Sequence, residues 1–186
     1  MLDKLTALDD PLVTEFFRAA ADEDDDELVR VRALVALTIR GDAEATRALD
    51  TLIAGPDDLL AFDVALASLA RLRGPSFYGT LTSIWRDEDR GADEKRSAMI
   101  AMEQLDAPRA LQDFASAIAS FGEVDSLPDD QLEMMILAFV RYDHAPGRAA
   151  LEALRERLRA SAASLDADQS DEMLGMVQEG IDLLNA

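Results

Sequence analysis

The sequence contains no cysteine, which excludes disulfide bonds and thiolate metal sites. Aromatic residues make up only 5% of the 186 residues, so a core has to be built mainly from alanine and leucine. The N-terminus has no basic segment followed by a long apolar run, and no stretch of about 20 uncharged apolar residues occurs anywhere in the chain. We therefore expect a cytoplasmic protein without a signal peptide or a membrane span.

Basic residues are scarce. The chain has 38 acidic and 18 basic side chains, for a formal net charge of −20. Such a charge disfavours nucleic acid and anionic membranes as partners, because like charges repel and no counterions are released on contact. Two interpretations stay open. Asp exceeds Glu and Arg exceeds Lys, which is typical of proteins from salt-accumulating, halophilic archaea; alternatively, the acidic surface attracts a basic partner.

One short pattern of small and large apolar residues recurs four times. In most copies a small residue is followed at once by a large apolar one, and the pair is repeated three residues later; the fourth copy has Met135 at its first small position. The last positions of the copies lie 32, 33 and 37 residues apart, a period typical of stacked two-helix repeats. The copies are Ala33-Leu34-x-Ala36-Leu37, Ala65-Leu66-x-Ser68-Leu69, Ala98-Met99-x-Ala101-Met102 and Met135-Ile136-x-Ala138-Phe139.

The spacing within each copy places its four residues on one face of a helix. The small residues let a neighbouring helix approach closely, and the large ones fill the space beside them. Each copy is followed by a break rich in Gly, Asp or Pro and then by a second apolar helix. The second helices align on Leu49, Leu81, Leu111 and Leu151.

Residues 31–42 resemble the first helix and turn of a HEAT-type repeat of the short, PBS-lyase-like form, and the resemblance extends over about residues 24–160. It implies an all-α fold, an α-solenoid of about four to five stacked antiparallel helix pairs. The second copy lacks the usual Asp in its turn, and the fourth is displaced by an insertion that we place between Gly122 and Pro128. Unrelated amphipathic helices in a non-repetitive bundle are the alternative.

A single repeat domain is expected over residues 1–186, with an N-terminal cap (1–23), four repeats (24–160) and a C-terminal capping helix (161–186). Residues 1–10 are expected to form a frayed lead-in or a short capping turn. Ser126 and Asp129 are expected to form a capping box, and residues 161–170 a polar linker. The predicted helices are 11–21, 24–40, 43–54, 58–72, 75–86, 93–105, 108–121, 129–142, 146–161 and 168–184.

In a HEAT-type stack the second helix of each pair lines the concave surface. By this resemblance, a partner protein would meet the outward positions of helices 43–54, 75–86, 108–121 and 146–160. These side chains mix acid, base, amide and aromatic groups, which suits a protein partner. Trp85 aligns with an apolar position and is expected in the core. The predicted partner-binding residues are Arg47, Asp50, Tyr78, Thr82, Arg109, Gln112, Asp113, Arg148 and Glu152.

Other motifs point to structure rather than to chemistry. Asp22, Asp24 and Asp26 have the spacing of calcium ligands, but the residues that complete an EF-hand loop are missing, so an acidic helix start is expected. His144 has no second histidine near it and is expected to be a turn residue. The arginines of 155–159 are expected to pair with neighbouring glutamates, and the methionines to fill the core. We predict no metal, no cofactor and no catalytic residue.

Three functions are compatible with the sequence. The leading hypothesis is a non-catalytic adaptor, a monomer or weak homodimer, that binds another protein on its concave surface. The second is an acidic inhibitor or immunity-type protein that blocks the basic site of a toxin or nucleic-acid enzyme; a single acidic patch would favour it. The third is an enzyme, since some relatives of this repeat type assist bilin attachment and others are DNA glycosylases, but the sequence holds no residue signature for either.

Overall fold

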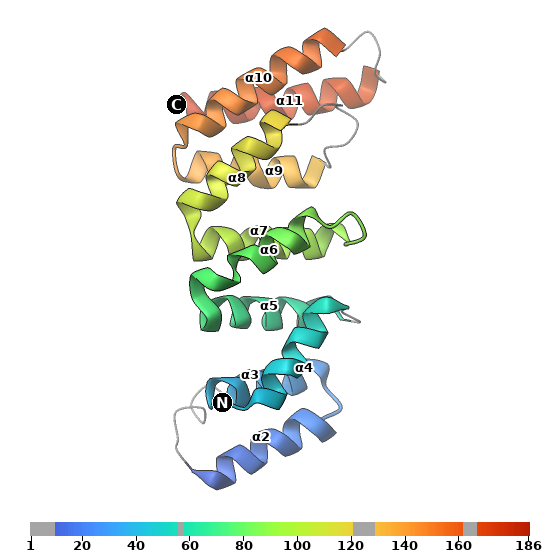
Figure 1. Cartoon of the computed structure of the whole chain (residues 1–186). Helices are drawn as coiled ribbons and strands as arrows, with labels where there is room; N and C mark the ends of the chain where they lie inside the picture. The colour runs from blue at the N-terminus through green and yellow to red at the C-terminus, as the bar shows by residue number, and fades with distance from the viewer. Residues whose placement is uncertain (1–9, 56–57, 121–128, 162–166) are drawn as a thin grey trace. The chain divides into compact units, whose positions relative to one another are not determined.

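The computed structural model describes residues 10–55, 58–120, 129–161 and 167–186. Within these ranges every regular element is a helix, so the chain is all-α as predicted (Figure 1). Residues 1–9 of the predicted lead-in, the insertion, Ser126 of the capping box and residues 162–166 of the polar linker lie outside the described residues. The elements are α2 (Pro11–Glu23), α3 (Glu27–Ile39), α4 (Ala43–Ala54), α5 (Leu59–Arg73), η1 (Gly74–Phe77), α6 (Tyr78–Arg86), α7 (Ala92–Leu105), α8 (Ala107–Ser120), α9 (Asp129–Arg141), α10 (Ala145–Ser161) and α11 (Ala167–Leu184).

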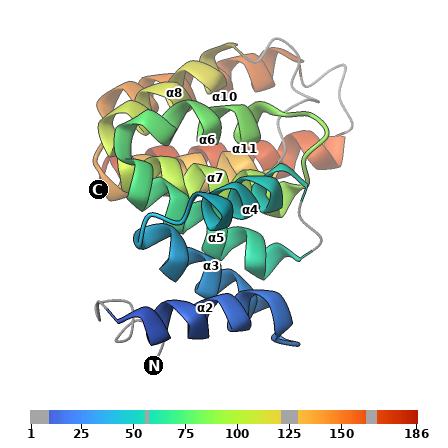
Figure 2. The ribbon, with the colours of Figure 1, turned by 60° about the horizontal axis from the view of Figure 1, so that its bottom comes forward.

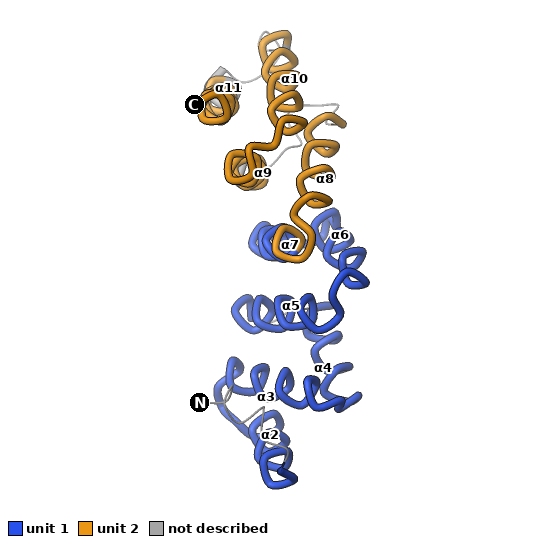
Figure 3. Tube along the Cα trace, turned by 90° about the vertical axis from the view of Figure 1, so that its left-hand side faces the viewer, with its two compact units in different colours: residues 1–101 blue, residues 102–186 orange. Residues whose placement is uncertain are grey.

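The chain divides into two compact units, residues 1–101 and 102–186, with the division inside α7 (Figure 3). In the first unit α2 packs on α3, α3 packs on both α4 and α5, and η1 connects α5 to α6 (Figure 2). In the second unit α8 packs on α9 and α10, and α11 packs on α9 and α10. Contacts therefore run between helices that are neighbours or next neighbours in the sequence. The predicted single repeat domain stays a prediction.

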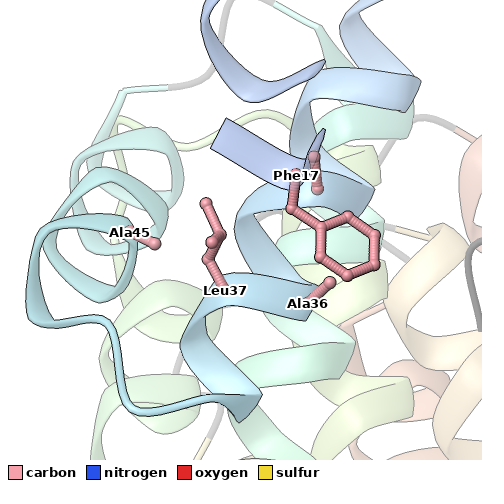
Figure 4. Close-up of a cluster of buried hydrophobic side chains, with 5 residues drawn as sticks. Phe17, Ala36, Leu37 and Ala45 are labelled. Atoms are coloured by element: carbon pink, nitrogen blue, oxygen red, sulfur yellow. The ribbon is translucent and has the colours of Figure 1, made fainter. Parts of the chain in front are cut away.

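The recurring pattern forms the core. Of its sixteen residues, all but Leu34 are buried, and Leu34 is half-buried. The first copy packs beneath α2, where Phe17 lies against Ala36 and Leu37 of α3, with Ala45 of α4 on the other side (Figure 4). The aligned leucines of the second helices are buried as well. The prediction that this pattern marks the packed face of each helix is confirmed.

Aspartates cap α2, α3, α4 and α5 in the first unit. The carboxylates of Asp10, Asp26, Asp42 and Asp58 accept hydrogen bonds from backbone N–H groups in the first turns of α2, α3, α4 and α5. These N–H groups have no partner inside the helix, so each cap satisfies a donor that would otherwise need water. The expected caps of α2 and α4 and the acidic start of α3 are confirmed.

Two helices end in the same hydrogen-bonded turn. After α3, Gly41 takes a positive φ of 83°, and the Asp42 N–H donates to the carbonyl of Leu37 over 3.0 Å. After α9, Asp143 takes a φ of 45°, and the His144 N–H donates to the carbonyl of Phe139 over 3.0 Å. This is the Schellman arrangement of helix ends. Copies one and four therefore share their turn, although one uses glycine and the other aspartate.

Candidate binding surface

The predicted partner-binding residues of α4 differ in their surroundings. Arg47 is exposed on the side of α4 away from the core. Asp50 is half-buried and bound in bidentate fashion by Arg73, with nitrogen–oxygen distances of 2.7 and 2.6 Å. This hydrogen bonding raises the pKa of Arg73. Asp50 therefore already has a partner on another helix, whereas the exposed Arg47 donates only to the carbonyl of Ala43 in its own helix, over 3.3 Å.

Tyr78 was expected to be exposed, and this prediction was wrong. Its side chain is only 1% exposed. Tyr78 precedes Leu81 by three residues and Trp85 by seven, so all three lie on one stripe of α6, and all are buried. The predicted burial of Trp85 is confirmed. Thr82 is half-buried, and its hydroxyl donates to the carbonyl of Tyr78 over 3.1 Å. The first unit therefore offers no aromatic anchor on its second helices.

The second unit brings more of the predicted residues together, because α8 and α10 pack against each other. Arg109 and Gln112 on α8 and Glu152 on α10 are exposed, and Asp113 is half-buried. Arg148 is half-buried; its guanidinium group donates to the backbone carbonyl of Leu184 and lies 3.3 Å from a carboxylate oxygen of Asp143. We call the exposed residues Arg109, Gln112 and Glu152 the second-helix row.

Arginines fix the ends of the second helices. A guanidinium nitrogen of Arg90 donates to the carbonyls of Ile53 and Ala54 over 2.9 and 2.7 Å, at the end of α4. Arg157 donates to the carbonyl of Ile118 over 2.6 Å, near the end of α8. The last carbonyls of a helix lack intrahelical partners and carry partial negative charge, so a cation there stabilises the helix end. These bonds span 36 to 39 residues and left no local signal in the sequence.

The exposed large apolar side chains that the structure describes do not lie on the helices that were predicted to bind a partner. Among the described residues, none of them lies on α4, α6, α8 or α10. The sequence did contain a signal for part of this surface. The middle position of the recurring pattern, written x above, is apolar in every copy: Val35, Ala67, Ile100 and Leu137. The exposed large apolar residues are Leu12, Phe16, Ile39, Leu59, Leu60, Leu72, Ile100, Leu137, Tyr142 and Leu183.

His144 follows α9 in the turn, as predicted. Its ring stacks on Phe139, with centroids 5.6 Å apart and an interplanar angle of 22°. Its Nε2 atom is buried without a hydrogen-bond partner in the described chain, and loss of hydration lowers the pKa of the imidazole. The ring thus serves as the apolar contact that often accompanies a Schellman turn.

Two further expectations concern the arginines and the methionines. Glu156 pairs with Arg155 and Arg159 over 3.2 and 3.0 Å, as predicted. Met99, Met102, Met135 and Met173 are buried, which confirms them as core residues, whereas Met134 and Met176 are half-buried.

Charge is also balanced locally at Asp42. This carboxylate accepts from the N–H of Ala45, which lowers its pKa most, and from the Arg18 guanidinium group. Within the described ranges, no three acidic or histidine side chains are grouped so that they could hold a metal ion. No described helix combines the length and the apolar composition that crossing a bilayer requires.

Comparison with protein-family models, with curated proteins and with solved structures gives no match.

Proposed function

We propose that this chain is a non-catalytic adaptor, built from HEAT-like helix pairs, that binds another protein on its second helices. The observation that carries the proposal is the division of α8 and α10 into two faces. Their large apolar residues are buried against neighbouring helices, while Arg109, Gln112 and Glu152 are exposed. A cation, an amide and an anion on paired helices suit the polar, hydrogen-bonded periphery of a protein interface.

The competing function, an acidic inhibitor of a basic site, is favoured less by the distribution of charge. The first unit carries 21 acidic and 12 basic side chains, and the second carries 17 and 6. Both units are thus acidic on their own, as expected when the excess serves solvation in high salt. A blocker of one basic site would concentrate its acidic residues in one place.

The adaptor proposal is tested by affinity capture from a lysate of the source organism, followed by quantitative mass spectrometry. The bait is the wild-type chain or a variant with Arg109→Ala, Gln112→Ala and Glu152→Ala. The matched control carries Arg159→Ala, Gln104→Ala and Glu172→Ala. It removes the same three types of side chain at exposed positions outside the second-helix row. Capture is done at low salt and in molar KCl, where the Debye length falls to about 3 Å.

A protein retained in molar KCl by the wild type and by the control, but lost by the second-helix variant, supports the proposal. Equal retention by all three baits places the contact elsewhere and overturns it. Capture of basic proteins at low salt alone means that the chain acts as a nonspecific polyanion, which also contradicts a specific adaptor role.

A further inference from the structure

In the first unit, α3, α5 and α7 each carry a copy of the recurring pattern and are the first helix of a pair. They present an apolar face away from the core. Val35 is two residues from both Ala33 and Leu37, so it lies about 200° round the helix from each of these buried residues. Ala67 on α5 and Ile100 on α7 occupy the same position in their copies, and Ala67 and Ile100 are exposed. Ile39 and Leu60 extend this face with exposed fractions of 50% and 56%.

These helices lie side by side within the first unit. α3 packs against α5. α5 is linked to α7 by a hydrogen bond that the Ser97 hydroxyl donates to Asp63 over 2.5 Å. Asp63 lies four residues before Ala67, and Ser97 three before Ile100, so the bond joins the two helices on this same side. We call the exposed side of α3, α5 and α7 within residues 1–101 the first-helix face.

Three arginines on the first-helix face have no partner among the described residues. Arg32, Arg71 and Arg96 are exposed, and no described side chain or carbonyl accepts a hydrogen bond from them. They lie three or four residues from Val35, Ala67 and Ile100, which places one beside each central apolar position. Each of the other thirteen arginines has at least one such interaction, a hydrogen bond, an ion pair, a ring contact or another electrostatic contact.

In the second unit, the arginine at the corresponding position is paired with a carboxylate. Arg141 lies four residues after Leu137, as Arg71 does after Ala67, but Arg141 forms an ion pair with Glu103. On α11 the exposed residues include Asp171, Glu172 and Glu179. In a chain of net charge −20, the described arginines that have no partner are therefore those of the first-helix face.

We propose that the first-helix face binds an acidic amphipathic helix of another protein. Apolar side chains of that helix would cover Ile39, Leu60 and Ile100, and its carboxylates would pair with the three arginines. Guanidinium groups recognise carboxylates in bidentate fashion, and burial beside apolar side chains strengthens such pairs. A peptide segment that follows the i, i+3, i+4 spacing presents both kinds of group on one side.

Nucleic acid and anionic membranes fit the first-helix face less well. Both spread negative charge far beyond three arginines and would meet the acidic remainder of the unit, including Asp63 and Asp93 on or beside this face. A backbone of phosphates would also leave Ile39 and Ile100 uncovered. A short peptide with a few carboxylates avoids both costs.

The test uses the full chain and a fluorescein-labelled helical peptide of about 18 residues, or five turns, with leucines along one side and glutamates beside them. Two further peptides replace the glutamates by lysine or the leucines by serine. Binding is measured by fluorescence anisotropy at about 0.15 M and 1 M KCl. Phosphatidylglycerol vesicles and single-stranded DNA are measured in parallel.

The informative variant carries Arg32→Gln, Arg71→Gln and Arg96→Gln. Its matched control, Arg47→Gln with Arg86→Gln and Arg159→Gln, removes the same charge from second helices at positions outside the second-helix row. A further variant, Leu60→Ser with Ile100→Ser, removes apolar surface. Because all of these positions are exposed, thermal melting followed by circular dichroism should change little in any variant.

We expect the acidic peptide to bind the wild type and the control within about twofold, and to bind the arginine and apolar variants at least about tenfold more weakly. The lysine and serine peptides should bind at least about tenfold more weakly to the wild type. Absence of acidic-peptide binding at roughly 1 mM overturns the proposal. Equal losses in the arginine variant and its control, or tight binding to vesicles or DNA alone, overturn it too.

The first-helix face and the second-helix row are separate surfaces, so the two proposals can fail independently. The Arg109, Gln112 and Glu152 substitutions leave the first-helix face intact, and the Arg32, Arg71 and Arg96 substitutions leave the second-helix row intact.

Discussion

Asp143 holds a backbone conformation that glycine adopts at lower cost. Its φ of 45° matches the role that Gly41 plays after α3, where φ is 83°. The left-handed region brings Cβ close to the following carbonyl and costs an L-residue about 1 kcal/mol. Its side chain is 86% exposed and interacts with Arg148 over 3.3 Å, a contact that is worth little at the surface.

We predict that Asp143→Gly raises the free energy of unfolding by about 0.5–1 kcal/mol, measured by urea denaturation. Gly41→Ala is the opposite change, since it places an L-residue at a positive φ. No atom lies within 4 Å of the added Cβ, so any loss of stability reflects the backbone conformation alone. It should lower stability by about 1 kcal/mol. A loss of stability in Asp143→Gly would contradict the assignment of strain to this turn.

His144 should make stability depend on pH near neutrality. Burial lowers its pKa below the ordinary value of 6.5, so the unfolded chain takes up a proton first as pH falls. The contribution of the neutral ring is therefore complete above pH 6.5, and it is lost as pH falls from 6.5 through the lowered folded-state pKa.

The measurement is the free energy of unfolding at several pH values between about 8 and 5.5, compared with His144→Phe, which keeps a ring on Phe139 but does not titrate. As pH falls, the free energy of unfolding of the wild type should decrease relative to that of His144→Phe. Because both chains carry the same carboxylates, their titration cancels. A difference that is independent of pH would show that the histidine ring is not desolvated in the folded state.

At the level of helices, Gly147 allows α10 to approach α9 closely. A Cβ at this position would lie closer than 3.0 Å to three atoms of the Phe139 ring. Alanine favours a helix over glycine by up to about 1 kcal/mol, so propensity alone would predict a gain. The clash should outweigh it, since a packed core accommodates an extra methyl only by shifting side chains or backbone.

We predict that Gly147→Ala lowers the free energy of unfolding by about 1–3 kcal/mol. Phe139→Leu should offset part of this loss, so the double variant should be more stable than the sum of the single changes predicts. Gly175→Ala, where no atom lies within 4 Å, is the control and should be neutral or stabilising. Additive effects of the changes at 139 and 147 would show that the two residues do not meet.

The helices and their packed faces could be predicted because their causes are local. The recurring pattern fixes which side of a helix is apolar, and aspartates before α2 and α4 satisfy backbone donors within three residues. The largest departure in the elements is the turn of 3-10 helix at Gly74–Phe77, where a helix from residue 75 was expected. Tyr78 was misplaced even though its spacing from Leu81 already indicated the buried stripe of α6.

The candidate surfaces could be predicted only in part, because they depend on contacts between distant residues. Arg47 and Arg109 are exposed as expected, whereas Asp50 is occupied by Arg73, which lies 23 residues away. The first-helix face was visible as apolar residues at recurring positions. Its significance depends on the fold, in which Ala67 and Ile100 are exposed, Val35 is half-buried, and the neighbouring arginines have no partner among the described residues.

For the whole molecule, the net charge of −20 should make folding depend on salt. Compaction brings like charges together, and dissolved ions screen their repulsion. The Debye length falls from about 10 Å at 0.1 M salt to about 3 Å at 1 M, so most of the stabilisation by screening should be reached below about 1 M. Exclusion of salt from apolar surface instead increases steadily with concentration and depends on the anion.

We therefore predict that the melting temperature rises in KCl from about 0.05 to 1 M and then levels off. A variant with Glu15→Gln, Glu133→Gln, Glu172→Gln and Glu179→Gln should show a smaller rise, because these exposed carboxylates add to the repulsion and take no part in a helix cap. If the melting temperatures of the two chains rise equally with KCl concentration, the rise reflects exclusion of salt from apolar surface and not screening of charge repulsion. A melting temperature that does not change up to 1 M KCl would mean that self-repulsion costs the fold little, and the acidic surface would then be better explained by attraction to a basic partner.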